Sequence, residues 1–206
     1  MSEPNILISV PETANYQLPD ATLLNFYKDI EDRVYWLNSE IDDFTLDLVQ
    51  YIMYWNKEDK DIPVEQRKPI KIIFNSPGGQ LDVAETIVTM IRLSKTPIYG
   101  FAIGCVASAA SLIYLSCHKR YALENSYFIL HKGSCSNITG DYENVMAAMD
   151  DYREQVDRMV SFYIKNTYYS EEEVTTKIKK DWYVRQPESL EKGIVNEIIT
   201  DIDVLL

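Results

Sequence analysis

Residues 70–79 of the chain read IKIIFNSPGG, a short and mostly apolar run that leads directly into a turn ending in two glycines. The apolar run predicts a buried strand over residues 70–74, and the Pro-Gly-Gly sequence predicts a tight turn. A helix is expected after the turn, because apolar residues recur there at helical spacing. They are Val83, Ile87, Val88 and Ile91.

The same order of elements recurs immediately downstream. Residues 97–103 predict a second strand that again ends at a glycine, and a run of small residues around Ser108 opens a helix that reaches Leu115. Two successive strand–turn–helix units favour stacked βα units and the α/β class.

Hydrophobic periodicity predicts the remaining elements. Strands are expected at 33–37, 120–122 and 126–130, a helix at 42–55 and a polar loop at 56–68. The apolar face of the 42–55 helix consists of Phe44, Leu48, Ile52 and Trp55. A long helix over about residues 141–165 carries apolar and long side chains on more than one face, so we expect it to project and to be covered by another subunit. Its main apolar face comprises Val145, Met149, Tyr152, Val156, Met159 and Tyr163.

Length and composition limit the classes of protein to consider. The 206 residues suffice for one domain with a substantial core, which we place at residues 21–206. Residues 1–20 contain three prolines and predict an N-terminal arm, of a kind that can line a pore or dock a neighbour and that, in the family named below, would form an axial loop. The formal net charge of −12 disfavours a nucleic-acid partner, which requires clustered Lys and Arg.

Cysteine usage and hydropathy indicate the compartment. The three cysteines show no C-x-x-C spacing, so we expect free thiols in a reducing cytosol and no metal site. No signal peptide and no membrane-spanning run is recognised, so a soluble cytoplasmic protein is expected.

Three residues form a candidate set for serine acyl transfer. Ser108 lies at a strand-to-helix turn, where free amides favour developing negative charge. His131 follows an apolar strand, and Asp181 precedes the hydrophobic residues 182–184, where partial burial would let it orient an imidazole. Each residue also has a purely structural interpretation: close helix packing at Ser108, a backbone-bonded histidine, and a loop acid paired with a neighbouring lysine. The second histidine, His118, lies in a polar turn and is assigned no role.

The Gly78-Gly79 pair is either a simple tight turn or part of an oxyanion hole. It lacks the Lys and Ser/Thr of a phosphate-binding loop and the G-x-G-x-x-G pattern, so nucleotide binding is weakly supported. The amide of Ala109, next after Ser108, would point into the same site.

These motifs together resemble the proteolytic subunits of ATP-dependent Clp proteases, the ClpP family, over roughly residues 20–200. The matching segments are Asn75 to Gly79, Gly104 to Ser108, Leu130-His131, and Asp181 followed by Pro187-Glu188 and residues 193–195. The resemblance implies that Ser108 is the nucleophile, His131 the general base and Asp181 its orienter. It also implies that Gly79 and Ala109 supply the oxyanion-hole amides.

The resemblance also implies a fold and partners. The fold is an α/β spiral of repeated ββα units, shared with crotonases, with a protruding handle helix at about 141–165. The expected assembly is a homo-oligomer of heptameric rings stacked as a tetradecamer, which encloses the sites and degrades unfolded polypeptides. No cofactor is expected, because ATP is used only by a separate Clp ATPase.

Several positions differ from the usual family pattern. Aromatic residues that help to receive the ATPase are replaced by Lys71 and Ile73, the acidic–basic pair before the aspartate is Lys179-Lys180, and the loop after the histidine begins Lys132-Gly133. These differences suggest a divergent or phage-type paralogue. They leave two alternatives to a serine endopeptidase: an inactive or regulatory ring subunit that assembles with a second ClpP-like subunit, and a crotonase-fold acyl-CoA hydratase or isomerase.

Overall fold

The computed structural model describes residues 20–135 and 138–205. The chain divides into two units, one ending at Asp32 and the other running from Arg33 onward. All but the last residue of the predicted N-terminal arm at 1–20 lies outside the described residues. The expectation of a single domain over residues 21–206 stays a prediction.

The described part of the first unit is helix α1 (Ala21–Glu31), which the sequence analysis did not predict. It begins at Asp20, whose side chain accepts a hydrogen bond from the Thr22 N–H at 3.0 Å. Such a cap satisfies one of the free amide donors at a helix start.

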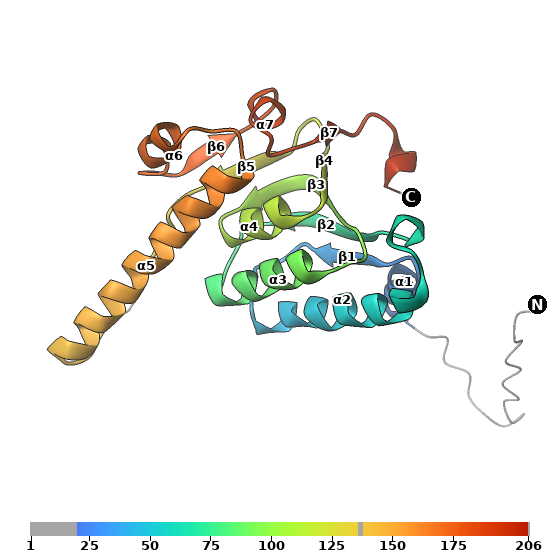
Figure 1. The fold of residues 1–206 in the computed structure, drawn as a ribbon, viewed down its shortest axis with the longest axis horizontal. Coiled ribbons are helices and arrows are strands. Elements are labelled where there is room, and N and C mark those ends of the chain that lie inside the picture. The colour runs from blue at the N-terminus through green and yellow to red at the C-terminus, as the bar shows by residue number, and fades with distance from the viewer. Residues whose placement is uncertain (1–19, 136–137, 206) are drawn as a thin grey trace, which may run out of the picture. The chain divides into compact units, whose positions relative to one another are not determined.

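The second unit is built on a seven-stranded sheet (Figure 1). Its main path has the order β1-β2-β3-β4-β7, with every pair on it parallel. Beyond β4, strand β5 pairs in parallel with the end of β3, and β6 pairs antiparallel with β5. The strands are β1 (Val34–Leu37), β2 (Ile70–Ser76), β3 (Ile98–Ala107), β4 (Lys119–Ala122), β5 (Tyr127–Leu130), β6 (Trp182–Val184) and β7 (Glu197–Ile198).

Helices connect these strands, and the predicted α/β class is confirmed. The order β2-α3-β3-α4 is the repeated strand–helix unit that the sequence predicts. The α-helices are α2 (Asp47–Glu58), α3 (Leu81–Leu93), α4 (Ala109–Ser116), α5 (Tyr142–Asn166), α6 (Glu171–Lys177) and α7 (Glu188–Glu191). Short 3₁₀ turns are η1 (Asp43–Leu46), η2 (Asp59–Asp61), η3 (Val64–Gln66) and η4 (Ile202–Val204).

The two faces of the sheet have separate apolar cores. On the face that packs against α4, the rings of Phe74 and Tyr114 lie 5.3 Å apart. Gly100 permits this close approach, because a side chain there would press on Tyr114 and Cys117. The opposite face is a cluster of buried residues, against which Val204 and Leu205 of the C-terminal segment pack. Its members are Ile73, Phe101, Tyr121 and Ile199.

Local corrections to the expected elements have simple physical causes. The helix expected from residue 42 begins as the 3₁₀ turn η1, which leaves Phe44 87% exposed instead of on the buried face. The expected loop at 56–68 contains the end of α2 and the turns η2 and η3. Strand β3 continues past residue 103 to Ala107, because its second half pairs with β5.

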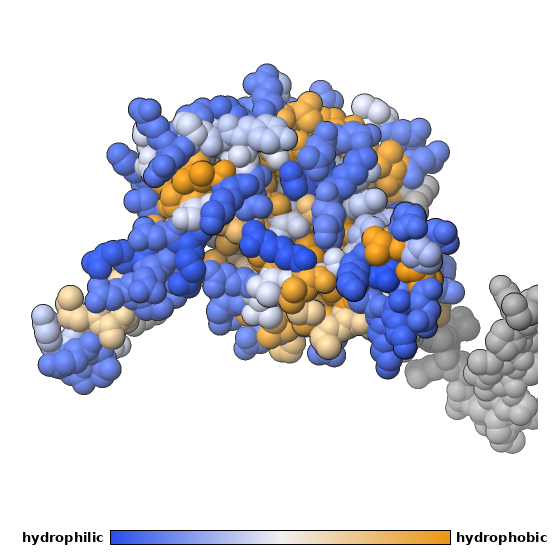
Figure 2. Space-filling view, in the orientation of Figure 1, coloured by the Kyte–Doolittle hydropathy of each residue, from blue (hydrophilic) through white to orange (hydrophobic). Residues whose placement is uncertain are grey.

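Helix α5 extends away from the sheet, as expected, and only Met159 and Tyr163 on it are buried (Figure 1). Met149, predicted on the apolar face, is 42% exposed. Figure 2 shows a mostly hydrophilic surface on this helix with a weakly apolar patch near its free end. Its burial by another subunit stays a prediction. In the part of the chain that the structure describes, no helix is both long and apolar enough to cross a membrane.

Candidate active site

Strand register brings Ser108 and His131 together. Ala107 is paired with Ile129 across β3 and β5, and the Ser108 N–H donates to the Ile129 carbonyl at 2.9 Å. Both residues therefore leave the sheet at the same edge, where their side chains meet. The His131 Nε2 atom lies 2.5 Å from the Ser108 Oγ atom, within hydrogen-bond distance.

Asp181 reaches the same site from the antiparallel partner strand. Leu130 on β5 is paired with Trp182 on the antiparallel strand β6. His131, which follows Leu130, therefore lies opposite Asp181, which precedes Trp182. The Asp181 Oδ1 atom lies 3.3 Å from His131 Nδ1. The expected partial burial of this acid is wrong: its side chain is 61% exposed, since the following residue, Trp182, points into the core instead.

The backbone at Ser108 is held in an unusual conformation. Its φ is +54° and its ψ is −127°, a region that residues with a side chain rarely adopt. The residue lies between the end of β3 and the start of α4, so its side chain is presented at a sharp strand-to-helix turn. Such strain is typical of residues whose side chain must point into a site.

The Pro77-Gly78-Gly79 turn packs directly against this serine. Gly78 has φ +95°, and a Cβ atom on it would lie 2.6 Å from both the Ala107 carbonyl oxygen and the Ser108 Cβ atom. Gly79 has φ +155° and a side chain there would collide with the backbone of Ile41. Glycine is therefore required at both positions by a close backbone approach.

The backbone N–H groups of Gly79, in this turn, and of Ala109, directly after Ser108, are free to receive an oxyanion. Backbone hydrogen bonds at the Ile41–Gly79 bridge use the Gly78 carbonyl and the Gln80 N–H, not the Gly79 N–H. Ala109 is the first residue of α4, where an N–H has no partner within the helix. Among the described residues, neither amide makes a hydrogen bond, and both residues line the cleft that contains Ser108 and His131.

This cleft has a volume of about 450 Å³. The turn at Gly79, the start of α4, the segment after His131 and the inner half of α5 form its walls. Residues from α5 that line it are Tyr152, Gln155 and Met159. The Tyr152 hydroxyl donates to the Gly133 carbonyl at 3.2 Å, which ties the segment after His131 to this helix.

A hydrogen-bond chain that sequence reasoning missed runs from α5 into the site. Ser111 Oγ donates to the Ser108 carbonyl at 2.6 Å. The Tyr163 hydroxyl lies 3.1 Å from Ser111 Oγ, within hydrogen-bond distance, and either oxygen can be the donor in that pair. Burial raises the pKa of Tyr163 to about 12, although hydrogen bonds with Ser111 and the His131 backbone act in the opposite direction. The helical period placed Tyr163 on a buried face but carried no signal of these bonds.

Other candidate groups lie outside the site. His118 Nδ1 accepts the Ile98 N–H at 2.9 Å, and burial lowers the pKa of its imidazole. Cys117 is buried, and this raises the pKa of its thiol to about 12. No group of three or more His, Cys, Asp or Glu side chains suited to a metal ion is found among the described residues.

Comparisons with known proteins give one consistent result. A family model described as Clp protease matches residues 20–201. The chain is 30% identical over 135 residues to ATP-dependent Clp protease proteolytic subunit 2 of Treponema denticola, covering 64% of this chain and 66% of the relative. It is also 30% identical over 133 residues to the subunit of the same name from Pseudomonas aeruginosa, with 64% and 66% covered. The matches thus span about two thirds of the length of these curated relatives.

A solved protein structure has a fold similar to that of this chain. A point mutant of ClpP1 from Listeria monocytogenes superposes with a TM-score of 0.74 at 25% sequence identity. The match covers 88% of this chain and 99% of that one. The similarity therefore extends over most of this chain and nearly all of the ClpP1 chain.

Proposed function

The chain belongs to the Clp protease family, and on this premise we propose that it is a serine endopeptidase that hydrolyses peptide bonds in unfolded polypeptides. The observation that carries the proposal is the 2.5 Å contact between Ser108 Oγ and His131 Nε2 at a strained strand-to-helix turn. A hydroxyl is a weak nucleophile until an adjacent base removes its proton.

In the proposed reaction, a substrate segment lies extended beside the Gly79 and His131 segments as an added strand. His131 takes the proton of Ser108 Oγ, which attacks the peptide carbonyl carbon. The negative charge on the carbonyl oxygen is received by the N–H groups of Gly79 and Ala109. His131, oriented by Asp181, then protonates the leaving amine, and a water molecule hydrolyses the acyl-enzyme.

This chemistry needs no metal and no organic cofactor, and we propose that the chain uses none. ATP would be consumed only by a separate Clp ATPase that unfolds substrates. The reaction proposed here also differs from that of an acyl-CoA hydratase or isomerase, because those reactions do not require a nucleophilic serine hydrogen-bonded to a histidine. Family membership does not favour that alternative.

We further propose a cytoplasmic homo-oligomer of heptameric rings stacked as a tetradecamer, with the sites facing an internal chamber. Large apolar side chains that are exposed on the single chain support this assembly, because water-exposed apolar surface is favourably buried at an interface. On α5 they are Tyr142, Met146 and Met149, and on α2 and α3 they include Met53 and Leu93. A Clp ATPase or a second ClpP-like subunit would be the further partner.

A fluorophosphonate carrying biotin tests the activity directly, because it reacts only with an activated serine. Peptide mapping should place the adduct on Ser108, and labelling should be lost in Ser108→Ala and His131→Ala. Ser116→Ala is the matched control, since Ser116 lies on α4 and only bonds the Ile113 carbonyl. Native mass spectrometry of the same sample reports the assembly. An assembled ring that takes up no label would favour the regulatory-subunit alternative over the peptidase.

A further inference from the structure

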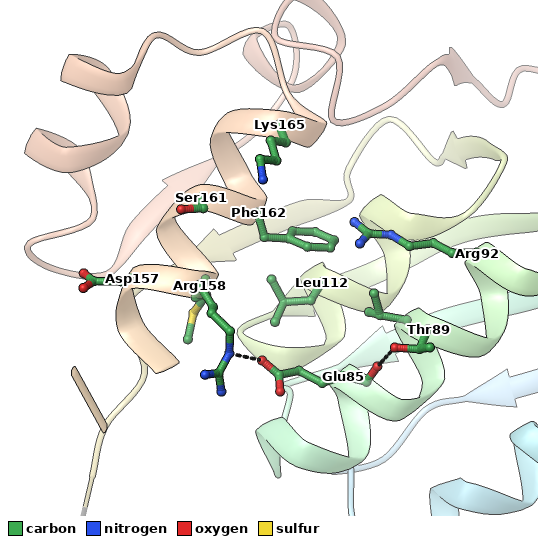
Figure 3. A pocket seen from close by; sticks show the side chains of 11 residues that line it. Glu85, Thr89, Arg92, Leu112, Asp157, Arg158, Ser161, Phe162 and Lys165 are labelled. Carbon is green, nitrogen blue, oxygen red and sulfur yellow. Dashed lines mark hydrogen bonds and ion pairs between the residues drawn. The ribbon is translucent and has the colours of Figure 1, made fainter. Parts of the chain in front are cut away.

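A second cavity lies between α3, α4 and α5, outside the cleft that contains Ser108 (Figure 3). Its volume is about 560 Å³, which is within the range of pockets that hold small molecules. The proposed peptidase reaction makes no use of this space.

The floor of the cavity is apolar. Val88 and Leu112 are 7% and 3% exposed, and both line it together with Met159 and Phe162. Figure 3 shows Leu112 and the ring of Phe162 directed into the space between α3 and α5. An apolar ligand body could therefore be removed from water here.

The cavity is lined by three basic residues, Arg92, Arg158 and Lys165, and by two acidic residues, Glu85 and Asp157. Arg158 is paired with Glu85, whose Oε1 atom lies 3.4 Å from the Arg158 Nε atom. The guanidinium of Arg92 lies instead over the ring of Phe162, 4.9 Å from its centroid. Lys165 extends toward the same ring from α5 (Figure 3).

Neither Arg92 nor Lys165 forms an ion pair with a described residue. Both side chains are therefore available to a ligand, in a cavity whose lining contains one more basic than acidic residue. Arginine and lysine both bind carboxylates through charge-assisted hydrogen bonds.

We propose that this cavity binds a small amphipathic anion, with its carboxylate between Arg92 and Lys165 and its apolar body on Phe162, Leu112 and Val88. A medium-chain fatty acid and the carboxyl end of a peptide with an apolar last residue share this chemistry. The positive charges of Arg92 and Lys165 favour an anionic ligand. A simple inorganic anion would bind poorly, because it has no apolar body to bury on the apolar floor.

The cavity adjoins the cleft that contains Ser108. Met159 lines both spaces, and Leu112 lies on α4, the helix that starts directly after Ser108. A ligand in the cavity therefore packs against the two helices that also form walls of the cleft.

Isothermal titration calorimetry on the full chain in its native assembly tests the proposal without reference to peptidase activity. We expect octanoate to bind at least about tenfold more tightly than octylammonium, which reverses the charge, and than acetate, which lacks the chain. N-acetyl-leucine, titrated in parallel, distinguishes a peptide-like carboxylate from a fatty acid as the preferred source.

The double variant Arg92→Gln/Lys165→Gln should weaken octanoate binding at least about tenfold, as expected when charge-assisted hydrogen bonds are lost. Lys57→Gln/Lys60→Gln is the matched control, because it changes the net charge equally at exposed positions that do not line this cavity. Circular dichroism verifies that both proteins are folded. Equal binding of octanoate and octylammonium, undiminished binding by the double variant, or no binding of either carboxylate would overturn the proposal.

Discussion

The Oδ1 atom of Asp181 lies 3.3 Å from the Nδ1 atom of His131, while 61% of the Asp181 side chain remains exposed to solvent. The imidazole is therefore oriented by a carboxylate that water can screen. Screening weakens the stabilisation that this acid could give to a protonated His131.

We accordingly expect Asp181→Asn to lower kcat/KM for a fluorogenic peptide by about 10²-fold, less than the ~10⁴-fold loss that follows the same change in a buried triad. The loss should be smaller than that of His131→Ala measured in parallel. Equal losses in the two variants would mean that Asp181 contributes as much as a buried acid. Asp150→Asn, at an exposed carboxylate paired with Arg153, controls for the change in charge.

Tyr163 links α5 to the residues on both sides of the Ser108–His131 contact. We expect Tyr163→Phe to reduce the rate of fluorophosphonate labelling about tenfold, because Ser111 and the His131 backbone each lose a hydrogen-bond partner, each bond contributing ~1 kcal/mol. The pH dependence of labelling should match that of the original chain if only positioning is affected.

Tyr114→Phe is the matched control for Tyr163→Phe. Tyr114 is equally buried, and its hydroxyl donates to the Tyr121 carbonyl at 2.8 Å, away from the site. Tyr114→Phe should lose about 1 kcal/mol and Tyr163→Phe about 2 kcal/mol of unfolding free energy in urea, but only Tyr163→Phe should lose labelling. A parallel fall in labelling for both would reduce the role of Tyr163 to general stability.

Gly78→Ala should abolish most activity. The new methyl group would lie 2.6 Å from the Ala107 carbonyl oxygen and from the Ser108 Cβ atom, so Ser108 must move. The φ of +95° adds backbone strain of about 1–2 kcal/mol for any residue with a side chain. Peptide cleavage and thermal unfolding together measure both effects.

Gly133→Ala separates strain from collision. Gly133 also has a positive φ of +77°, but the nearest atom to an added Cβ is the Met159 Cε atom at an ordinary 3.6 Å. We expect this variant to lose about 1–2 kcal/mol of stability while retaining most of its cleavage activity. Comparable losses of activity at Gly78 and Gly133 would contradict the importance of the contact with Ser108.

Acid should destabilise the sheet unit through Asp59. Its side chain is 1% exposed and is held by Arg33 through contacts of 2.7 and 2.8 Å, and by the Thr96 hydroxyl at 2.8 Å. The Arg33 guanidinium lowers the pKa of this carboxyl below its usual range, although burial acts in the opposite direction. Its contribution to stability is therefore complete above the unfolded pKa of about 4 and is lost as the pH falls through the folded value.

Asp59→Asn should lower the unfolding free energy by about 3 kcal/mol at neutral pH, because it removes the buried carboxylate that bonds Arg33 and leaves only the more distant Glu58 at 3.6 Å. It should also make the decline in stability below about pH 4 shallower than in the original chain. Urea titrations across this pH range measure both quantities. If the unfolding free energy of the variant declines below about pH 4 as steeply as that of the original chain, other carboxylates control acid unfolding.

The amino-acid sequence by itself determined most elements of the sheet unit and the residue types at its site. Local signals were sufficient for β2, α3 and α4, because apolar spacing and glycine punctuation act over a few residues. They were insufficient for the start of α2 and for Phe44, where a 3₁₀ turn changes which side chains face the core. The motifs around Ser108 and His131 carried the resemblance to the family that the family model shows.

Only the tertiary structure decided how these residues meet. Asp181 is one of 32 acidic residues, and its selection by geometry depends on the pairing of Leu130 with Trp182, which are far apart in the chain. The bond from Tyr163 to Ser111 and the cavity over Phe162 likewise depend on how α5 packs against α4. Strand register and helix packing are set by many weak contacts between distant segments, and no local pattern in the sequence contains them.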